Sequence, residues 1–135
     1  MRAITDKVRA TDWRSLFHRM TLTHLRALAT LALVSFCLFV PGQMSLQPMD
    51  RDEPRFAQAS KQMLETGDFV DIRFQDEARH KKPVGIYWLQ SATVSIGKAM
   101  GVSDPLRQIW LYRIPSLVGA IALVLLTYWA ALAFL

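Results

Sequence analysis

The chain has 135 residues, of which 52% are apolar and 20% charged, and its formal net charge is +5. Two stretches without a charged residue, 27–49 and 114–135, are each long enough to cross a bilayer, because a membrane-spanning helix needs roughly 20 apolar residues. What remains is too short for a large soluble enzyme core, and the single cysteine, Cys37, excludes a disulfide-stapled secreted domain.

Basic residues dominate the segment before the first stretch, 1–21, which we predict to be a cytoplasmic tail. Cationic flanks of membrane spans stay on the cytoplasmic side, so the segment between the two stretches, 43–113, is expected to lie outside. In a Gram-negative bacterium this places the chain in the inner (plasma) membrane, with its loop in the periplasm. A nucleic-acid partner is excluded, because topology accounts for the basic tail and the loop carries 10 Lys and Arg against 9 Asp and Glu.

The first span is predicted at 22–42 and is interpreted as an uncleaved anchor. A secretory signal is the alternative, but no small-x-small cleavage site follows the apolar stretch. We expect Pro41 and Gly42 to end this helix, since proline interrupts the hydrogen-bond ladder and glycine allows a turn. The second span is predicted at 114–135, with Pro115 in its first turn. No Lys or Arg marks its far end, so we expect the chain to be truncated there.

Two helices are predicted in the outer loop. The first covers 52–65, with acids in its first turn and Gly67 as its C-terminal stop. Its buried face is predicted to contain Phe56, Ala59, Ser60, Met63 and Leu64. Segment 68–79 is predicted to be extended or looped, and 83–101 to be a helix that lies in the membrane interface. The fold class is therefore an all-α membrane protein, in which two transmembrane helices flank an outer loop with amphipathic juxtamembrane helices.

The acidic run 50–53 is the first candidate site. Asp50 and Asp52 are two positions apart and could share a divalent cation, which prefers oxygen ligands. One of these carboxylates could instead act as a general base towards a sugar hydroxyl. The alternative without chemistry is a helix N-cap, in which a carboxylate accepts from free backbone N–H groups.

The lysines before the second loop helix are the second candidate site. Lys81 and Lys82 could hold the phosphate of a lipid-linked donor. The alternative is that they anchor the helix by snorkelling to the membrane surface. Nearby aromatic residues are interpreted as interfacial side chains or as a platform for a sugar or polyprenyl chain: Tyr87, Trp88, Trp110 and Tyr112.

The order of these motifs resembles the amino-terminal part of the polytopic membrane glycosyltransferases of family 39. The resemblance rests on the run 52–56, on Gly67-Asp68-Phe69, on Lys82-Pro83 with Tyr87-Trp88-Leu89, and on Arg113-x-Pro115-Ser116. The family includes bacterial aminoarabinose transferases that modify lipid A and dolichyl-phosphate-mannose protein mannosyltransferases. It implies the start of a GT-C-type fold, membrane lipids as partners and a polyprenyl-phosphate sugar donor. It also implies a lipid A, other glycan or protein acceptor, and that the remainder of the enzyme is missing from this chain.

The resemblance also implies roles for single residues. Asp52 matches the family's essential acid, with Glu53 as its partner in catalysis. Lys82 and Arg55 match positions near the donor phosphate, and Tyr87 and Lys81 are candidate substrate contacts. The bacterial lipid A branch usually has an acidic residue at position 81 and a second proline at position 84, which puts a metal ligand at 81 and the aminoarabinose assignment in doubt. The cofactor is unknown, with a divalent cation as the candidate, and the rival hypothesis is a non-enzymatic two-span protein that binds lipid headgroups or a membrane partner.

Overall fold

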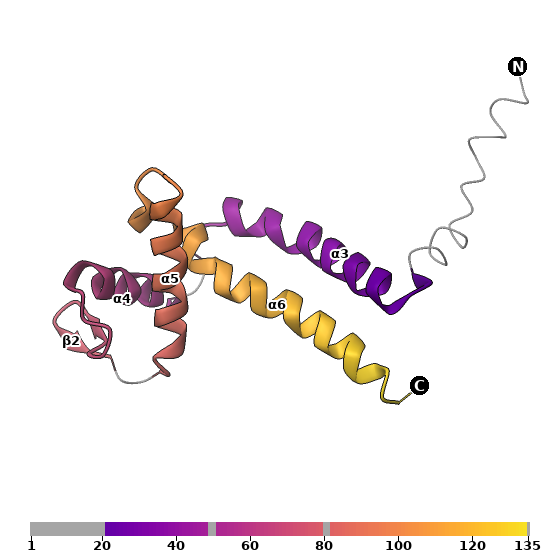
Figure 1. Cartoon of the computed structure of the whole chain (residues 1–135). Helices are drawn as coiled ribbons and strands as arrows, with labels where there is room; N and C mark the ends of the chain where they lie inside the picture. The colour runs from indigo at the N-terminus through magenta and orange to yellow at the C-terminus, as the bar shows by residue number, and fades with distance from the viewer. Residues whose placement is uncertain (1–20, 49–50, 80–81, 135) are drawn as a thin grey trace, which may run out of the picture. The chain divides into compact units, whose positions relative to one another are not determined.

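The computed structural model describes residues 21–48, 51–79 and 82–134. The predicted basic tail therefore lies, except for Thr21, outside the described residues. The chain is mostly helical, as predicted, and divides into two compact units, 1–38 with 121–135 and 39–120. The elements in chain order are α3 (His24–Ser45), α4 (Asp52–Thr66), β1 (Arg73–Phe74), β2 (Glu77–Ala78), α5 (Gly85–Ala99), the 3₁₀ helix η1 (Pro105–Arg107) and α6 (Ile109–Ala131) (Figure 1).

The helices α3 and α6 are both long and apolar enough to cross a membrane. Only 11% of the most apolar window of each helix is buried within the protein, so most of their apolar side chains face outwards. Leu38 on α3 and Leu123 and Trp129 on α6 are examples, each at least two-thirds exposed. Such surfaces are typical of helices that lie in lipid, and the two predicted apolar helices are confirmed.

The end of α3 differs from the prediction. The helix continues through Pro41 and Gly42 to Ser45, so the expectation that these two residues end it is wrong. Proline has a backbone φ suited to a helix, so it can be accommodated even though it lacks an N–H donor and its ring crowds the carbonyl four positions earlier. The next turn is closed by the Ser45 hydroxyl, which donates to the Pro41 carbonyl at 2.8 Å, and by the Leu46 N–H, which donates to the Gly42 carbonyl at 3.4 Å.

The start of α6 also differs, because the helix begins at Ile109 rather than at position 114. Pro115 consequently lies inside the helix and not in its first turn. A helical residue without an N–H leaves the carbonyl four positions earlier without its usual partner. That carbonyl belongs to Leu111. The Thr93 hydroxyl of α5 lies 2.9 Å from it and also 2.9 Å from the Gln90 carbonyl of its own helix, and it can donate to either. A neighbouring helix thus offers a donor to the group that the proline frees.

The first unit contains the beginning of α3 and the end of α6. Nδ1 of His24 lies 3.0 Å from the Tyr128 hydroxyl, so the two helix ends meet in antiparallel fashion. Ala27 and Ser35 are the buried residues of α3. The contact between a histidine and a tyrosine joins amphipathic side chains at the ends of two apolar helices, where such residues are favoured.

The second unit is built around α4 and α5, which cross each other (Figure 1). Gly67 ends α4 with φ 72°, and its N–H donates to the Met63 carbonyl, as the predicted C-terminal stop requires. The segment after it forms a short antiparallel hairpin, in which Arg73 pairs with Ala78 and Phe74 with Glu77. This two-stranded hairpin is the extended part of the segment predicted to be extended or looped.

Two small hydrophobic clusters hold the second unit together. The first contains Ala59, Met63, Ile72 and Tyr87, and the second contains Val94, Leu111 and Tyr112. The predicted apolar face of the first loop helix is confirmed, because Ala59, Ser60 and Met63 are buried. The interpretation of Tyr87 and Tyr112 as interfacial aromatics is wrong, since they are 0% and 3% exposed. Trp88, by contrast, is half-exposed.

Helix α5 packs some of its polar side chains inwards, beside the apolar Tyr87 and Val94. Its buried residues include Gln90, Ser91 and Gly97, whereas Trp88 and Ile96 are exposed. The Gln90 amide accepts from the Ser60 hydroxyl at 2.7 Å and donates to the Tyr112 carbonyl at 3.1 Å. Among the described residues, no buried side-chain nitrogen or oxygen lacks a hydrogen-bond partner. Small residues and satisfied polar groups between helices, with apolar residues outside, are typical of packing within membranes.

Candidate functional site

The acidic run begins α4. Asp52 and Glu53 occupy the first turn, where the positive end of the helix dipole favours carboxylates. The N-cap position is held by Arg51, which makes no side-chain cap hydrogen bond. The described residues therefore give no support to a side-chain N-cap, and Asp50 lies outside them. The carboxylates of Asp52 and Glu53 have different surroundings.

Glu53 forms a partly buried ion pair with Arg113, which we call the Arg113 joint. The Arg113 guanidinium donates through Nε to Oε1 and through Nη2 to Oε2 of Glu53, the second contact being 3.2 Å. Its Nη1 donates to the carbonyls of Gln43 and Leu46, both at 2.7 Å. The Arg113 side chain is 11% exposed and that of Glu53 31%. One guanidinium thus ties the end of α3, the start of α4 and the start of α6 together.

Asp52 has a more open environment. Its side chain is 48% exposed, and Oδ1 lies 3.9 Å from Nη2 of Arg79. Arg79 is held in place on two sides, because its Nε donates to the Tyr87 hydroxyl at 3.0 Å and its guanidinium carbon lies 5.3 Å from the centre of the Phe56 ring. A fixed cation beside a half-exposed carboxylate makes a site that an incoming hydroxyl group can reach.

Tyr87 supports this site from within the core. The ring is fully buried and packs against Phe56 with 5.2 Å between ring centres. Its hydroxyl orients Arg79, so Tyr87 reaches the Asp52 carboxylate through that guanidinium. The contact between Tyr87 and a substrate stays a prediction, and the role that the structure gives the side chain is positioning.

The predicted donor-binding cations lie at the surface. Arg55 and Lys82 are both exposed, and neither forms an ion pair with another residue that the structure describes. Lys81 lies outside the described residues, as does Asp50. Within the described part of the chain, no three His, Cys, Asp or Glu side chains are grouped so that they could hold a metal ion. The proposed divalent cation stays a prediction.

A shallow polar pocket lies at the opposite end of α4. It has a volume of about 160 Å³ and is lined by Gln62, Met63, Thr66, Asp68, Asp71 and Arg73. The loop beside it is pinned by the Asp68 carboxylate, which accepts from the N–H groups of Val70 at 2.9 Å and Asp71 at 3.0 Å. These backbone hydrogen bonds lower the pKa of Asp68 below its usual value of 3.8. None of the candidate catalytic, donor-binding or metal-binding residues lines this pocket.

Sequence reasoning missed Arg79 and the partner of Glu53. Arg79 lies in a segment predicted only to be extended or looped, and nothing in its neighbours points to a ring stacked beneath it. Arg113 belongs to a quoted motif, but Glu53 is 60 residues away along the chain. The charge of Arg113 could have predicted an acidic partner, because a cation at the start of an apolar helix needs one when it is buried.

Comparison with known proteins gives partial likenesses to longer chains. The chain is 36% identical over 74 residues to an uncharacterized protein of Aquifex aeolicus (strain VF5), which covers 55% of this chain and 17% of that protein. It is 34% identical over 64 residues to the undecaprenyl phosphate-alpha-4-amino-4-deoxy-L-arabinose arabinosyl transferase of Edwardsiella ictaluri (strain 93-146), which covers 47% of this chain and 11% of the transferase. The chain thus spans less than a fifth of the length of these relatives. No family model matches the chain, and no solved structure gives a significant match.

The likeness to the arabinosyl transferase supports a relation to glycosyltransferases at a coarse level. Together with α3 and α6, it also indicates a membrane location.

Proposed function

We propose that this chain is part of a membrane glycosyltransferase that moves a sugar from a polyprenyl-phosphate donor to a lipid A, other glycan or protein acceptor. The observation that carries this proposal is the likeness over 64 residues to an arabinosyl transferase whose printed name contains undecaprenyl phosphate. In this proposal α3 and α6 are the first two spans of a GT-C-type fold in a bacterial inner membrane. The second unit then faces the periplasm, and the amino terminus faces the cytoplasm.

The two carboxylates in the first turn of α4 have different roles in this proposal. Glu53 is occupied by Arg113 and keeps the start of α4 in place, so it acts by positioning. Asp52 is half-exposed beside Arg79 and is the group that accepts a proton from the attacking acceptor hydroxyl, or orients that hydroxyl. The new bond forms between the acceptor oxygen and the anomeric carbon, and the bond from that carbon to the lipid phosphate breaks.

In this proposal the exposed cations Lys82 and Arg55 stabilise the lipid phosphate, which is the leaving group. As the bond to the anomeric carbon breaks, negative charge develops on the lipid phosphate, and a fixed cation lowers the energy of that state. Lys82 offers an exposed ammonium at the start of α5, and Arg55 offers a guanidinium on the first turn of α4. Neither is engaged by another described side chain, which leaves their donors available to a phosphate.

Donor binding can be tested on the purified chain in detergent micelles, with undecaprenyl phosphate as the probe. A charged hydrogen bond contributes about 1.5–3 kcal/mol, so Lys82→Ala is expected to weaken binding by about tenfold or more. Lys98→Ala is the matched control, because it removes the same charge from the other end of α5 and should change affinity less than twofold. Equal affinity of the Lys82→Ala and Lys98→Ala chains would contradict the assignment of Lys82.

Transfer itself is tested in membranes that contain the longest reading frame carrying these residues. Asp52→Asn and Lys82→Ala should abolish transfer of labelled sugar from its polyprenyl-phosphate donor, while the amount of inserted protein stays normal. Near-normal transfer by either variant would refute the role given to that residue. A frame without further spans, together with undiminished lipid binding, would instead favour the non-enzymatic membrane protein.

A further inference from the structure

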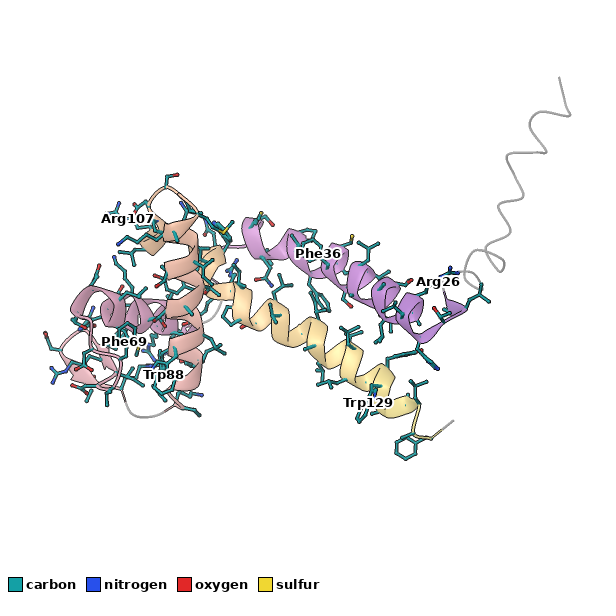
Figure 2. All side chains as sticks on the ribbon, viewed as in Figure 1. Arg26, Phe36, Phe69, Trp88, Arg107 and Trp129 are labelled. Carbon is teal, nitrogen blue, oxygen red and sulfur yellow. The ribbon has the colours of Figure 1, made fainter. Side chains whose placement is uncertain are left out.

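Four large apolar side chains gather at one place on the second unit. Phe69 and Val70, in the loop after α4, are 44% and 83% exposed, and Trp88 and Leu89, on the first turn and a half of α5, are 50% and 58% exposed. The indole N–H of Trp88 donates to the Phe69 carbonyl at 2.8 Å, which joins the loop to the helix. Figure 2 shows the labelled Phe69 and Trp88 close together. We call these four residues the apolar prong.

The prong is held from both sides. The Trp88 indole fixes the carbonyl of Phe69, and the Asp68 carboxylate fixes the N–H groups of the following residues, Val70 and Asp71. A loop that met only water would not need a fixed backbone at Val70, its most exposed apolar residue. Exposed apolar side chains that are grouped and fixed are typical of a contact surface.

The distribution of polar and apolar residues around α5 indicates the environment of this surface. The inward face is mixed, since Gln90 and Ser91 are buried beside Tyr87 and Val94, whereas the outward face carries the exposed Trp88, Leu89 and Ile96. A helix whose outward face met water would be expected to show mainly polar residues there. An apolar surrounding explains this outward face of α5, and the prong extends the same apolar surface at the helix start.

The second unit is directly connected to two helices that can span a membrane. Both ends of the second unit continue into α3 and α6, the two helices able to span a membrane. Helix α5 contains no acidic residue, and the exposed Lys82 and Lys98 lie just before and near the end of it. The two acids that flank Phe69 and Val70 are engaged, Asp68 with backbone N–H groups and Asp71 with Arg73. Cations at the edges of an apolar surface complement the anionic headgroups of a bilayer.

We propose that the apolar prong inserts into the acyl region of the leaflet on its own side of the membrane, with Lys82 at the headgroup level. The outward face of α5 lies along the same leaflet. This inference concerns a lipid-contacting surface, and it does not depend on the transferase reaction.

The experiment places an environment-sensitive fluorophore on the prong. The native cysteine is removed by Cys37→Ala, Val70→Cys is introduced and labelled with a nitrobenzoxadiazole dye, and the full chain is reconstituted in vesicles of phosphatidylethanolamine and phosphatidylglycerol. Quenching is then measured with nitroxide-labelled lipids and, separately, with aqueous iodide. The matched control is Asp76→Cys in the same background, because Asp76 is exposed in the turn of the neighbouring hairpin.

The proposal expects the dye at position 70 to be quenched several-fold more strongly by nitroxide lipids than the dye at position 76, and to be shielded from iodide. Strong iodide quenching at position 70, with no response to nitroxide lipids, would overturn the proposal. Shielding from both quenchers would also overturn it, since the prong would then be covered by protein, such as a second copy of the chain. Circular dichroism of each labelled chain verifies that the helices are intact.

Discussion

Removing the guanidinium of Arg113 should loosen the start of α4. Arg113→Met keeps most of the side-chain volume but deletes four hydrogen bonds, two to the Glu53 carboxylate and one each to the carbonyls of Gln43 and Leu46. Breaking a buried ion pair by removing one partner costs about 3–5 kcal/mol. Because the Glu53 side chain is 31% exposed and water can partly replace the lost donor, we expect the lower end, about 3 kcal/mol.

Hydrogen exchange measured by mass spectrometry on the chain in detergent micelles tests this value. At 1.36 kcal/mol for each tenfold change, 3 kcal/mol corresponds to an increase of about 150-fold in the exchange of α4 amides. Glu53→Gln should have a smaller effect, since its amide oxygen still accepts from Arg113. The control is Arg107→Ala, which removes a 78% exposed guanidinium paired with Asp104 and should cost less than about 1 kcal/mol. If Arg113→Met were as mild as Arg107→Ala, the interpretation of Arg113 as a joint would be refuted.

Three further predictions concern single contacts in the second unit. Thr93→Val should destabilise it by about 1–2 kcal/mol in thermal unfolding, because the Leu111 carbonyl loses its donor. The cost should be smaller in a Pro115→Ala background, since that substitution restores a backbone N–H for the carbonyl. Equal costs in both backgrounds would contradict this account. Gly97→Ala should also destabilise, since its new Cβ would lie 2.9 Å from both Leu111 methyl groups in a tightly packed place. The control is Gly119→Ala, which has open space in the interior of α6 and should raise the Tm slightly through helix propensity. A Tm raised equally by Gly97→Ala would refute the packing argument. Backbone hydrogen bonds lower the pKa of Asp68 in the folded state. The contribution of Asp68 to stability is therefore present above pH 3.8 and is lost as the pH falls through the lowered value. The amide chemical shifts of Val70 and Asp71 should titrate with a midpoint below pH 3.8, and a midpoint at or above that pH would exclude the hydrogen bonds.

Local signals located α4 well. Acids in the first turn, a helical face of which Ala59, Ser60 and Met63 are buried, and a glycine stop act over a few residues each, so the sequence alone places them. The end of α3 and the start of α6 could not be predicted correctly from their prolines. Whether a helix continues through a proline depends on which group donates to the carbonyl four positions earlier. For Pro115 the answer is Thr93, which reaches the Leu111 carbonyl from another helix.

The surroundings of the candidate site required the folded chain. Tyr87 has the composition of an interfacial residue, with an apolar ring and a polar tip. Its burial follows from Phe56, which covers the ring, and from Arg79, which satisfies the hydroxyl. The difference between Asp52 and Glu53 is likewise invisible in the sequence, because it depends on which carboxylate meets Arg113.

The Arg113 joint also fixes the rotation of α6 about its own axis. A helix in lipid has little preference for one rotational setting when apolar side chains surround it, as they do along much of α6. Each residue advances around the helix by about 100°, so a slip of one position would carry the guanidinium away from the Glu53 carboxylate and from both carbonyls of the α3 end. The orientation of this apolar helix is therefore set at its polar end, where Arg113 acts together with the buried Leu111 and Tyr112.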